Sequence, residues 1–231
     1  MPSATVRYRA RKCIFRSVSL YYSFIWRSDF DQSEFTNIFV THEQVQKIIA
    51  DKHIQAVKFT GSTAGGMDIA AQAGFHMKKG TYELGGNDPF LVLEGADLEL
   101  AAQCAYSSRM HMNAQTGFNA KRFIIEESVY DEFRDRLLEI VKEKTVIGDP
   151  LDPETTLGPM CDADQLKELK NNVRRAIKKD GGRIIMGDLD FRMDDPALRD
   201  GNYLKPIVTE GILPHSQSFA TEFYGPVFNL F

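Results

Sequence analysis

From residue 36 onward, short apolar runs alternate with longer amphipathic segments, and this alternation restricts the chain to a small set of folds. Residues 90–93 (Phe-Leu-Val-Leu) form a compact apolar run typical of a buried parallel strand. Residues 56–60 and 123–125 are further short strands, with helical segments between them. Strands that alternate with helices favour a mostly parallel sheet with helices on both faces, so the sequence predicts an α/β fold.

Five helices are predicted from their caps and apolar faces. Thr41 is predicted to cap the first helix and Ser128 the fourth. The predicted helices cover residues 41–49, an Ala/Gly-rich segment after Thr63 to about residue 79, residues 97–112, 128–144 and 165–179. Three more strands are predicted at residues 183–186, 203–209 and 227–231, and Pro206 indicates that the second of them lies at a sheet edge.

Composition and charge exclude several classes of function. The 231 residues carry a net charge of −4 and no basic stripe of the kind that binds nucleic acid. No apolar run approaches the roughly 20 residues that a membrane-spanning helix needs. The three cysteines, Cys13, Cys104 and Cys161, are too widely spaced for a disulfide framework or a zinc site. Cys104 is predicted to be a buried, inert thiol on a helix face, and Cys161 a surface or packing residue.

Residues 1–34 differ from the rest of the chain and form a divergent N-terminal segment. They are rich in arginine and serine, and no acidic residue precedes Asp29. This composition is typical of a mitochondrial transit peptide, which predicts a mitochondrial location. The alternative is an N-terminus that carries no address, in which case a cytoplasmic location is expected.

Two glycine-containing segments are candidates for a cofactor site. Gly61-Ser62-Thr63-Ala64-Gly65-Gly66 joins a predicted strand to a predicted helix, and the N–H groups at such a helix start suit a phosphate. The alternative is that these small residues only allow close packing. Glu83 precedes Gly85 and Gly86, a position where a carboxylate can act as a general base or be an ordinary surface acid.

Two further segments carry little meaning when each is taken alone. Residues 113–122 (Asn-Ala-Gln-Thr-Gly-Phe-Asn-Ala-Lys-Arg) follow a predicted helix, and residues 222–227 (Glu-Phe-Tyr-Gly-Pro-Val) lead into the last strand. Taken in this order, the four segments resemble the aldehyde dehydrogenase family. Residues 148–160, from Gly-Asp-Pro to Gly-Pro-Met, also match the family. Glu-Leu-Gly-Gly-Asn-Asp-Pro-Phe at 83–90 is most similar to the succinate-semialdehyde dehydrogenase branch. The resemblance covers roughly residues 35–231 and implies a partial aldehyde dehydrogenase-like fold.

The resemblance implies a domain organisation and an NAD or NADP cofactor. Residues 35–84 match a remnant of the Rossmann-like dinucleotide-binding domain, and residues 85–231 match the catalytic-type domain without its C-terminal end. Glu83 corresponds to the general base. The residues that correspond to cofactor contacts are Gly61, Ser62 and Gly66 near the pyrophosphate, Leu84 near the nicotinamide, Glu222 at the nicotinamide ribose, and Tyr224 in place of a phenylalanine. Residues 1–34 do not match the family's N-terminal half, so weakened cofactor binding is expected.

The main departure from the family is Gly117, which stands where the nucleophilic cysteine is expected. The 34 positions from Glu83 to Gly117 equal the family's spacing from base to nucleophile, so the glycine is a substitution at the site. A residue without a side chain does not form the covalent adduct with an aldehyde. Met112 and Ala114 also replace the asparagine and glycine that flank the family's site.

Two functions are open at this point. Gly117 and the unmatched family segments predict a protein without catalytic activity, which acts as a structural or interaction subunit of a larger assembly or as a homo-oligomer. A partial parallel sheet leaves unpaired strand edges, which also favours a protein partner. The alternative is NAD(P)-dependent oxidation of an aldehyde similar to succinate semialdehyde to a carboxylic acid.

Overall fold

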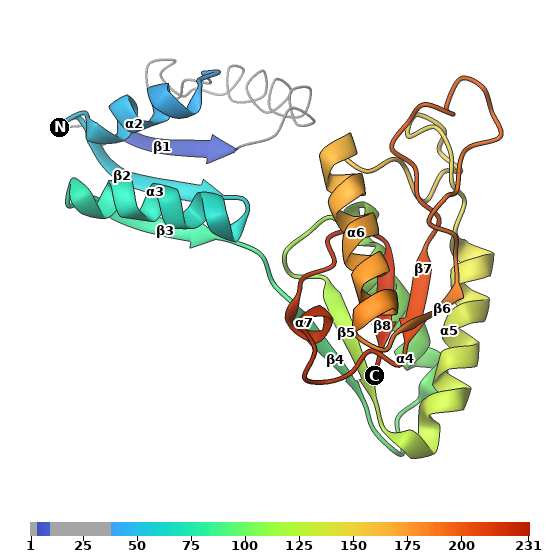
Figure 1. The fold of residues 1–231 in the computed structure, drawn as a ribbon. Helices are drawn as coiled ribbons and strands as arrows, with labels where there is room; N and C mark the ends of the chain where they lie inside the picture. Colours follow the sequence, from blue (N-terminus) through green and yellow to red (C-terminus); the bar gives the residue numbers. More distant parts are fainter. Residues whose placement is uncertain (1–3, 10–37) are drawn as a thin grey trace. The chain divides into compact units, whose positions relative to one another are not determined.

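The structure is a computed structural model that describes residues 4–9 and 38–231 (Figure 1). Apart from residues 4–9, the predicted N-terminal segment lies outside the described residues. The chain divides into two compact units, Met1–Gly85 and Gly86–Phe231, and each is described by itself. None of the helices described between residues 38 and 231 is long and apolar enough to cross a membrane.

Within residues 4–9 and 38–85, the unit Met1–Gly85 has a parallel three-stranded sheet and two helices. The strands are β1 (Ala4–Arg9), β2 (Ile54–Thr60) and β3 (Lys79–Glu83), in the order β1-β2-β3, and the helices are α2 (His42–Ala50) and α3 (Thr63–Phe75). Val57 and Phe59 lie on one face of β2 and are buried against both helices. Thr41 caps α2 in a capping box with Gln44, as predicted.

The unit Gly86–Phe231 is built on a five-stranded sheet in the order β4-β5-β8-β7-β6. Its strands are β4 (Asp88–Val92), β5 (Ala120–Ile125), β6 (Arg183–Met186), β7 (Ile207–Glu210) and β8 (Val227–Leu230). All pairs are parallel except β6 with β7, which is antiparallel. The predicted α/β class with a mostly parallel sheet is therefore confirmed.

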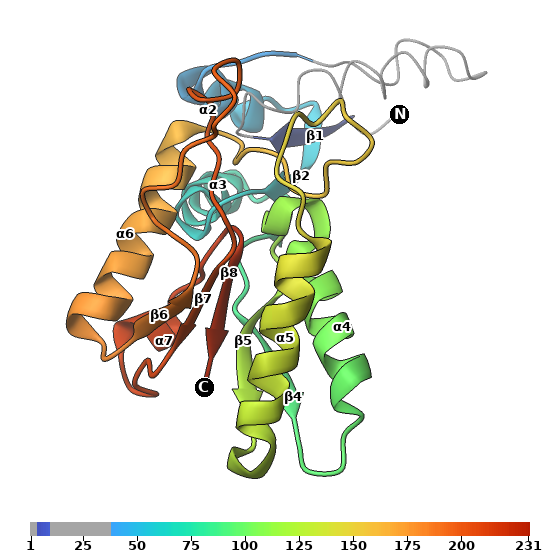
Figure 2. The ribbon, with the colours of Figure 1, turned by 90° about the vertical axis from the view of Figure 1, so that its right-hand side faces the viewer.

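Helices cover both faces of this sheet (Figure 2). The helices are α4 (Leu98–Met110), α5 (Tyr130–Lys144), α6 (Ala163–Lys179) and α7 (Gln217–Ala220), with the 3-10 turns η2 (His111–Ala114) and η3 (Glu127–Val129). Phe228 packs with α4 and α5 in one core cluster, whereas its neighbour Val227 packs with α6 in another. Successive strand residues point to opposite faces, so the two clusters lie on opposite sides of the sheet.

Four local predictions are wrong, each for a physical reason. Residues 90–93 do not form a buried strand, because β4 lies at the edge of the sheet and Leu91 and Leu93 are 62% and 61% exposed. Pro206 does not mark an edge strand, because β7 lies between β6 and β8 and begins one residue later, at Ile207. Ser128 does not cap α5, because it lies inside η3. The helix predicted to reach residue 79 ends at Phe75, and β3, which the sequence analysis missed, begins at Lys79.

Glu210 at the end of β7 joins three elements through its carboxylate. Tyr130 on α5 donates a hydrogen bond to Glu210 Oε2 at 2.9 Å, and Arg183 on β6 donates from Nε to Oε1 at 2.8 Å. Burial raises the pKa of this carboxyl, but the hydrogen bonds and the charge of Arg183 outweigh burial. The pKa of Glu210 therefore lies below its ordinary value of 4.5.

We expect Glu210→Gln to flatten the acid limb of the stability profile. A carboxyl whose folded pKa is lowered stabilises the fold above its unfolded pKa, and that contribution disappears as the pH falls through the folded pKa. Thermal midpoints measured between pH 3 and pH 7 should therefore fall less steeply for the variant than for the wild type once the pH drops below the ordinary glutamate pKa of 4.5. The exposed Glu139→Gln on α5 is the control. An unchanged acid limb in Glu210→Gln would contradict the assignment.

Candidate functional site

Arg109 at the end of α4 fixes the turn that carries Glu222 and Tyr224. Its side chain is fully buried and donates to three backbone carbonyls of the turn, those of Phe223, Gly225 and Val227, the last at 2.7 Å. Burial lowers the pKa of Arg109 to about 9, against the opposing effect of Glu222, so the guanidinium is still charged at neutral pH. The turn is thus organised around one buried cation.

The loop that leads to Gly117 has an unusual backbone. Met112, Asn113 and Ala114 have φ angles of 52°, 56° and 57°, in the left-handed region that glycine and asparagine tolerate best. Residues with these backbone angles do not continue a right-handed helix. The helix predicted at residues 97–112 therefore ends at Met110. The Asn113 side chain accepts a hydrogen bond from the Gly158 N–H at 3.1 Å, which helps to hold the loop in this conformation.

Gln115 connects the same loop to two other segments. Its side-chain oxygen accepts a hydrogen bond from the Cys161 N–H at 2.9 Å, and its backbone carbonyl accepts one from the Tyr224 hydroxyl. The second bond is possible only because this chain has tyrosine where the family resemblance places phenylalanine. The loop and the 222–227 turn are therefore joined directly.

The Gly117 carbonyl is closely packed although the residue has no side chain. It accepts a hydrogen bond from Lys121 Nζ at 2.6 Å. It also lies so close to Gly86 that a Cβ atom placed at residue 86 would come within 2.5 Å of the carbonyl oxygen. Gly86 is therefore needed for this approach, and residue 117 holds a defined backbone position.

Lys121 and Glu222 form an ion pair inside the unit. Lys121 Nζ lies 3.3 Å from Glu222 Oε1, and the Lys121 side chain is fully buried while that of Glu222 is 23% exposed. Burial lowers the pKa of Lys121 and raises that of Glu222, and in each case the partner's charge opposes the effect of burial. Glu222 thus presents a partly exposed carboxylate, which fits the hydroxyl groups of a sugar.

The remaining predicted site residues lie in the other unit. Ser62 caps α3 by accepting a hydrogen bond from the Gly65 N–H at 3.2 Å. A Cβ atom at Gly66 would come within 2.3 Å of the Leu84 side chain, and one at Gly61 within 2.7 Å of Phe59. Close packing therefore accounts for these two glycines. The first-turn N–H groups of Thr63 and Ala64 precede the capped part of α3 and are suitably placed for an anion.

Glu83 is the last residue of β3 and its side chain is exposed. Its backbone carbonyl accepts a hydrogen bond from the Gly61 N–H at 3.0 Å, which joins the two predicted segments of this unit. The structure thus brings together Gly61, Ser62, Gly66, Glu83 and Leu84 in one unit, and Gly117, Glu222 and Tyr224 in the other.

The two buried cations of the site, Arg109 and Lys121, were not predicted from the sequence. Arg109 lies in a helix and Lys121 in the strand run Ala120-Lys121-Arg122, where charged residues are ordinarily exposed. The prediction that Cys104 is buried was wrong, because it lies on the exposed face of α4. Cys161 is half-buried, and its Sγ lies 3.5 Å from Asp162 Oδ2.

A family model described as "Aldehyde dehydrogenase family" matches residues 19–231, more than half of the chain. The chain belongs to the aldehyde dehydrogenase family. This result confirms the resemblance inferred from the motifs, and the assignment of Gly117 to the nucleophile position stays a prediction.

Similar members of the aldehyde dehydrogenase family carry related names. The chain is 39% identical over 186 residues to succinate semialdehyde dehydrogenase Sad of Escherichia coli. This alignment covers 80% of this chain and 38% of the Escherichia coli protein. It is 35% identical over 196 residues to the NADP+ succinate-semialdehyde dehydrogenase of Deinococcus radiodurans. This alignment covers 85% of this chain and 39% of the Deinococcus radiodurans protein. The chain therefore spans about two fifths of the length of these relatives.

Solved structures of the family show the same fold. The succinic semialdehyde dehydrogenase of Streptococcus pyogenes, solved with NADP+, superposes with a TM-score of 0.88 at 30% identity. The match covers 98% of this chain and 48% of that one. The partial aldehyde dehydrogenase-like fold is therefore confirmed.

We expect Arg109→Met to destabilise the unit Gly86–Phe231 strongly. The substitution keeps most of the apolar stem but removes the guanidinium from the carbonyls of Phe223, Gly225 and Val227, of which Gly225 still accepts from the Val227 N–H. The loss of these charge-assisted hydrogen bonds costs about 3 kcal/mol or more. Urea unfolding followed by circular dichroism measures the loss. The surface variant Arg136→Met, which removes ion pairs to Glu99 and Glu132, is the control and should change stability little. Equal effects of the two variants would contradict the role of Arg109.

We expect Met112→Gly to stabilise the loop. Met112 is 62% exposed, so little buried contact is lost, and glycine removes the cost of a left-handed φ. Glycine also raises the backbone entropy of the unfolded chain, which offsets part of this gain. The free energy of unfolding measured in urea should therefore rise by roughly 0.5 kcal/mol. Leu100→Gly, at a 57% exposed helical position, is the matched control and should lose about 1 kcal/mol. A loss in both variants would show that the loop is not strained.

Proposed function

We propose that this chain is a non-catalytic member of the aldehyde dehydrogenase family that acts as a structural or interaction subunit. The observation that carries the proposal is Gly117. In the family reaction implied by the resemblance, a cysteine thiolate at this position adds to the aldehyde carbon. Removal of the nucleophile lowers kcat about 10⁶-fold in a serine protease, and a comparable loss is expected here.

The packing of the site supports this proposal. The backbone carbonyl of Gly117 accepts a hydrogen bond from the Lys121 ammonium and lies close to Gly86, so these contacts need no side chain at residue 117. A scaffold that keeps its fold while lacking the reactive group is suited to a structural role.

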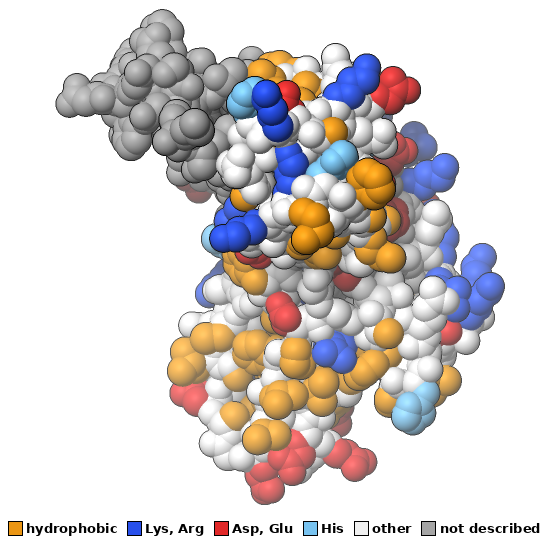
Figure 3. All heavy atoms as spheres, turned by 90° about the vertical axis from the view of Figure 1, so that its left-hand side faces the viewer, with side chains coloured by type: hydrophobic (Ala, Val, Ile, Leu, Met, Phe, Trp, Pro, Cys, Tyr) orange, Lys and Arg blue, Asp and Glu red, His pale blue; other side chains and the backbone are white. Residues whose placement is uncertain are grey.

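The surface of the unit Gly86–Phe231 supports a protein partner. β4 is an edge strand of the five-stranded sheet. Leu91 and Leu93, in and just after β4, are 62% and 61% exposed. Hydrophobic side chains gather over the lower part of the surface in Figure 3, which belongs to this unit. An unpaired strand edge next to exposed apolar side chains is typical of a surface that another chain covers.

The second candidate function is NAD(P)-dependent oxidation of an aldehyde similar to succinate semialdehyde to its acid. The names of the relatives favour this candidate more directly than the first. NAD(P)+ would accept the hydride. The partly exposed Glu222 carboxylate fits the nicotinamide ribose hydroxyls, Ser62 at the start of α3 fits the pyrophosphate region, and Glu83 would act as the base.

Assays with the purified chain separate the two candidates. We expect no NADPH formation at 340 nm from succinate semialdehyde and NADP+, because residue 117 supplies no thiolate. Gly117→Cys alone is expected to remain inactive, since Met112 and Ala114 also depart from the family at this loop; Gly117→Ser is the matched control. Turnover by the wild-type chain above the protein-free rate would overturn the first candidate and establish the second. Calorimetric titration with NADP+ reports cofactor binding independently of turnover.

A further inference from the structure

Lys121 connects two parts of the unit that the sequence places about a hundred residues apart. Its fully buried ammonium group donates to the Gly117 carbonyl at 2.6 Å and to the Asn119 carbonyl at 3.1 Å. Glu222 Oε1 lies 3.3 Å away and completes a set of three oxygens around Nζ. Lys121 therefore contacts both the 113–122 loop and the 222–227 turn.

The surroundings of Lys121 explain why these contacts belong together. A buried ammonium is costly unless its three N–H groups are paired and an anion balances its charge. The other buried cation, Arg109, donates to the carbonyls of the 222–227 turn. Lys121 is therefore the cation that faces the Glu222 carboxylate, and the Gly117 carbonyl must point inward to complete its hydrogen bonds.

We propose that Lys121 is a positioning residue that keeps Glu222 ionised and holds the Gly117 carbonyl next to it, so that the loop and the turn behave as one rigid element. This role acts through backbone atoms at residue 117, and it holds whether or not the chain oxidises aldehydes. Three other groups act on the ion pair between Lys121 and Glu222. They are the guanidinium of Arg109 on α4, the carboxylate of Asp88 on β4 and the backbone of Gly86.

The test measures the Glu222 carboxyl directly. In protein labelled with ¹³C at the glutamate carboxyl groups, the Glu222 signal is assigned by its loss in Glu222→Gln and then titrated. We expect Lys121→Met to raise the pKa of Glu222 by about one unit or more, because an opposite charge at this distance lowers a carboxyl pKa by 1–3 units. Lys121→Arg should keep most of the lowering. Amide hydrogen exchange of residues 116–119 should become about tenfold faster in Lys121→Met.

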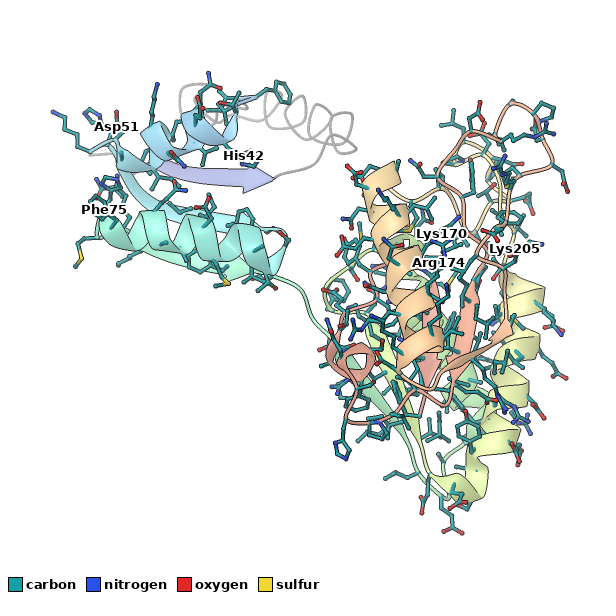
Figure 4. The ribbon with its side chains drawn as sticks, viewed as in Figure 1. His42, Asp51, Phe75, Lys170, Arg174 and Lys205 are labelled. Carbon is teal, nitrogen blue, oxygen red and sulfur yellow. The ribbon has the colours of Figure 1, made fainter. Side chains whose placement is uncertain are left out.

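Lys205→Met is the matched control, because it removes the same charge from an exposed lysine. Lys205 lies between β6 and β7 with its ammonium 4.8 Å from the centre of the Phe191 ring, and Figure 4 labels it. This variant should leave both the Glu222 titration and the exchange of residues 116–119 unchanged. An unchanged Glu222 pKa in folded Lys121→Met would overturn the proposal.

A measurement on the wild-type chain covers the case in which the lysine variant does not fold. The ¹³Cε signal of Lys121 should shift at the same pH as the Glu222 carboxyl signal, because protonation of Glu222 removes the anion that faces Nζ. Coincident titrations support the proposal. A Lys121 signal that does not respond while Glu222 titrates would overturn it.

Discussion

The arrangement of the site depends on the hydrogen bonds that the buried guanidinium of Arg109 donates to backbone carbonyls at residues 223, 225 and 227. Three carbonyls in the turn before β8 and at its first residue, those of Phe223, Gly225 and Val227, converge on one point, and Arg109 supplies the donors there. Because α4 packs against the sheet through a fully buried core, the position of Arg109 is set by the fold. Glu222 and Tyr224 belong to the same turn, so their positions follow from this helix rather than from local sequence.

The charges of the site are balanced as a group. Arg109 and Lys121 are two cations in the interior, and Glu222 is the carboxylate that acts on both. Asp88 on β4 is a second carboxylate that acts on Lys121. Further stabilisation comes from backbone carbonyl dipoles at five residues of the two segments. Removal of any one charge leaves the others buried with fewer partners, which makes the group intolerant of single substitutions.

Sequence patterns predicted those elements whose burial comes from their own apolar residues. The apolar runs that became β5 and β8 are of this kind, as is α6 with its buried Leu169 and Val173. The run at residues 90–93 became the edge strand β4, of which only Val92 is buried, because the apolar pattern does not show which strand lies at the edge. β3 was missed because its residues are polar and mostly exposed, and it is a strand only through pairing with β2. The buried cations were missed for a related reason, since their partners lie far along the chain and no local pattern reports them. The candidate site residues were predicted because four short motifs occur in the order found in the family.

The loop around Gly117 has a backbone that contacts from other segments hold in place. Three successive residues take left-handed backbone angles, and two of them, Met112 and Ala114, have side chains that disfavour this conformation. Local preference therefore does not produce the loop. Contacts from outside hold it, and those to Gln115 from Tyr224 and to Gly117 from Lys121 end on backbone carbonyls. Backbone contacts are indifferent to the side chain at residue 117, so the geometry of the loop does not depend on which side chain stands there.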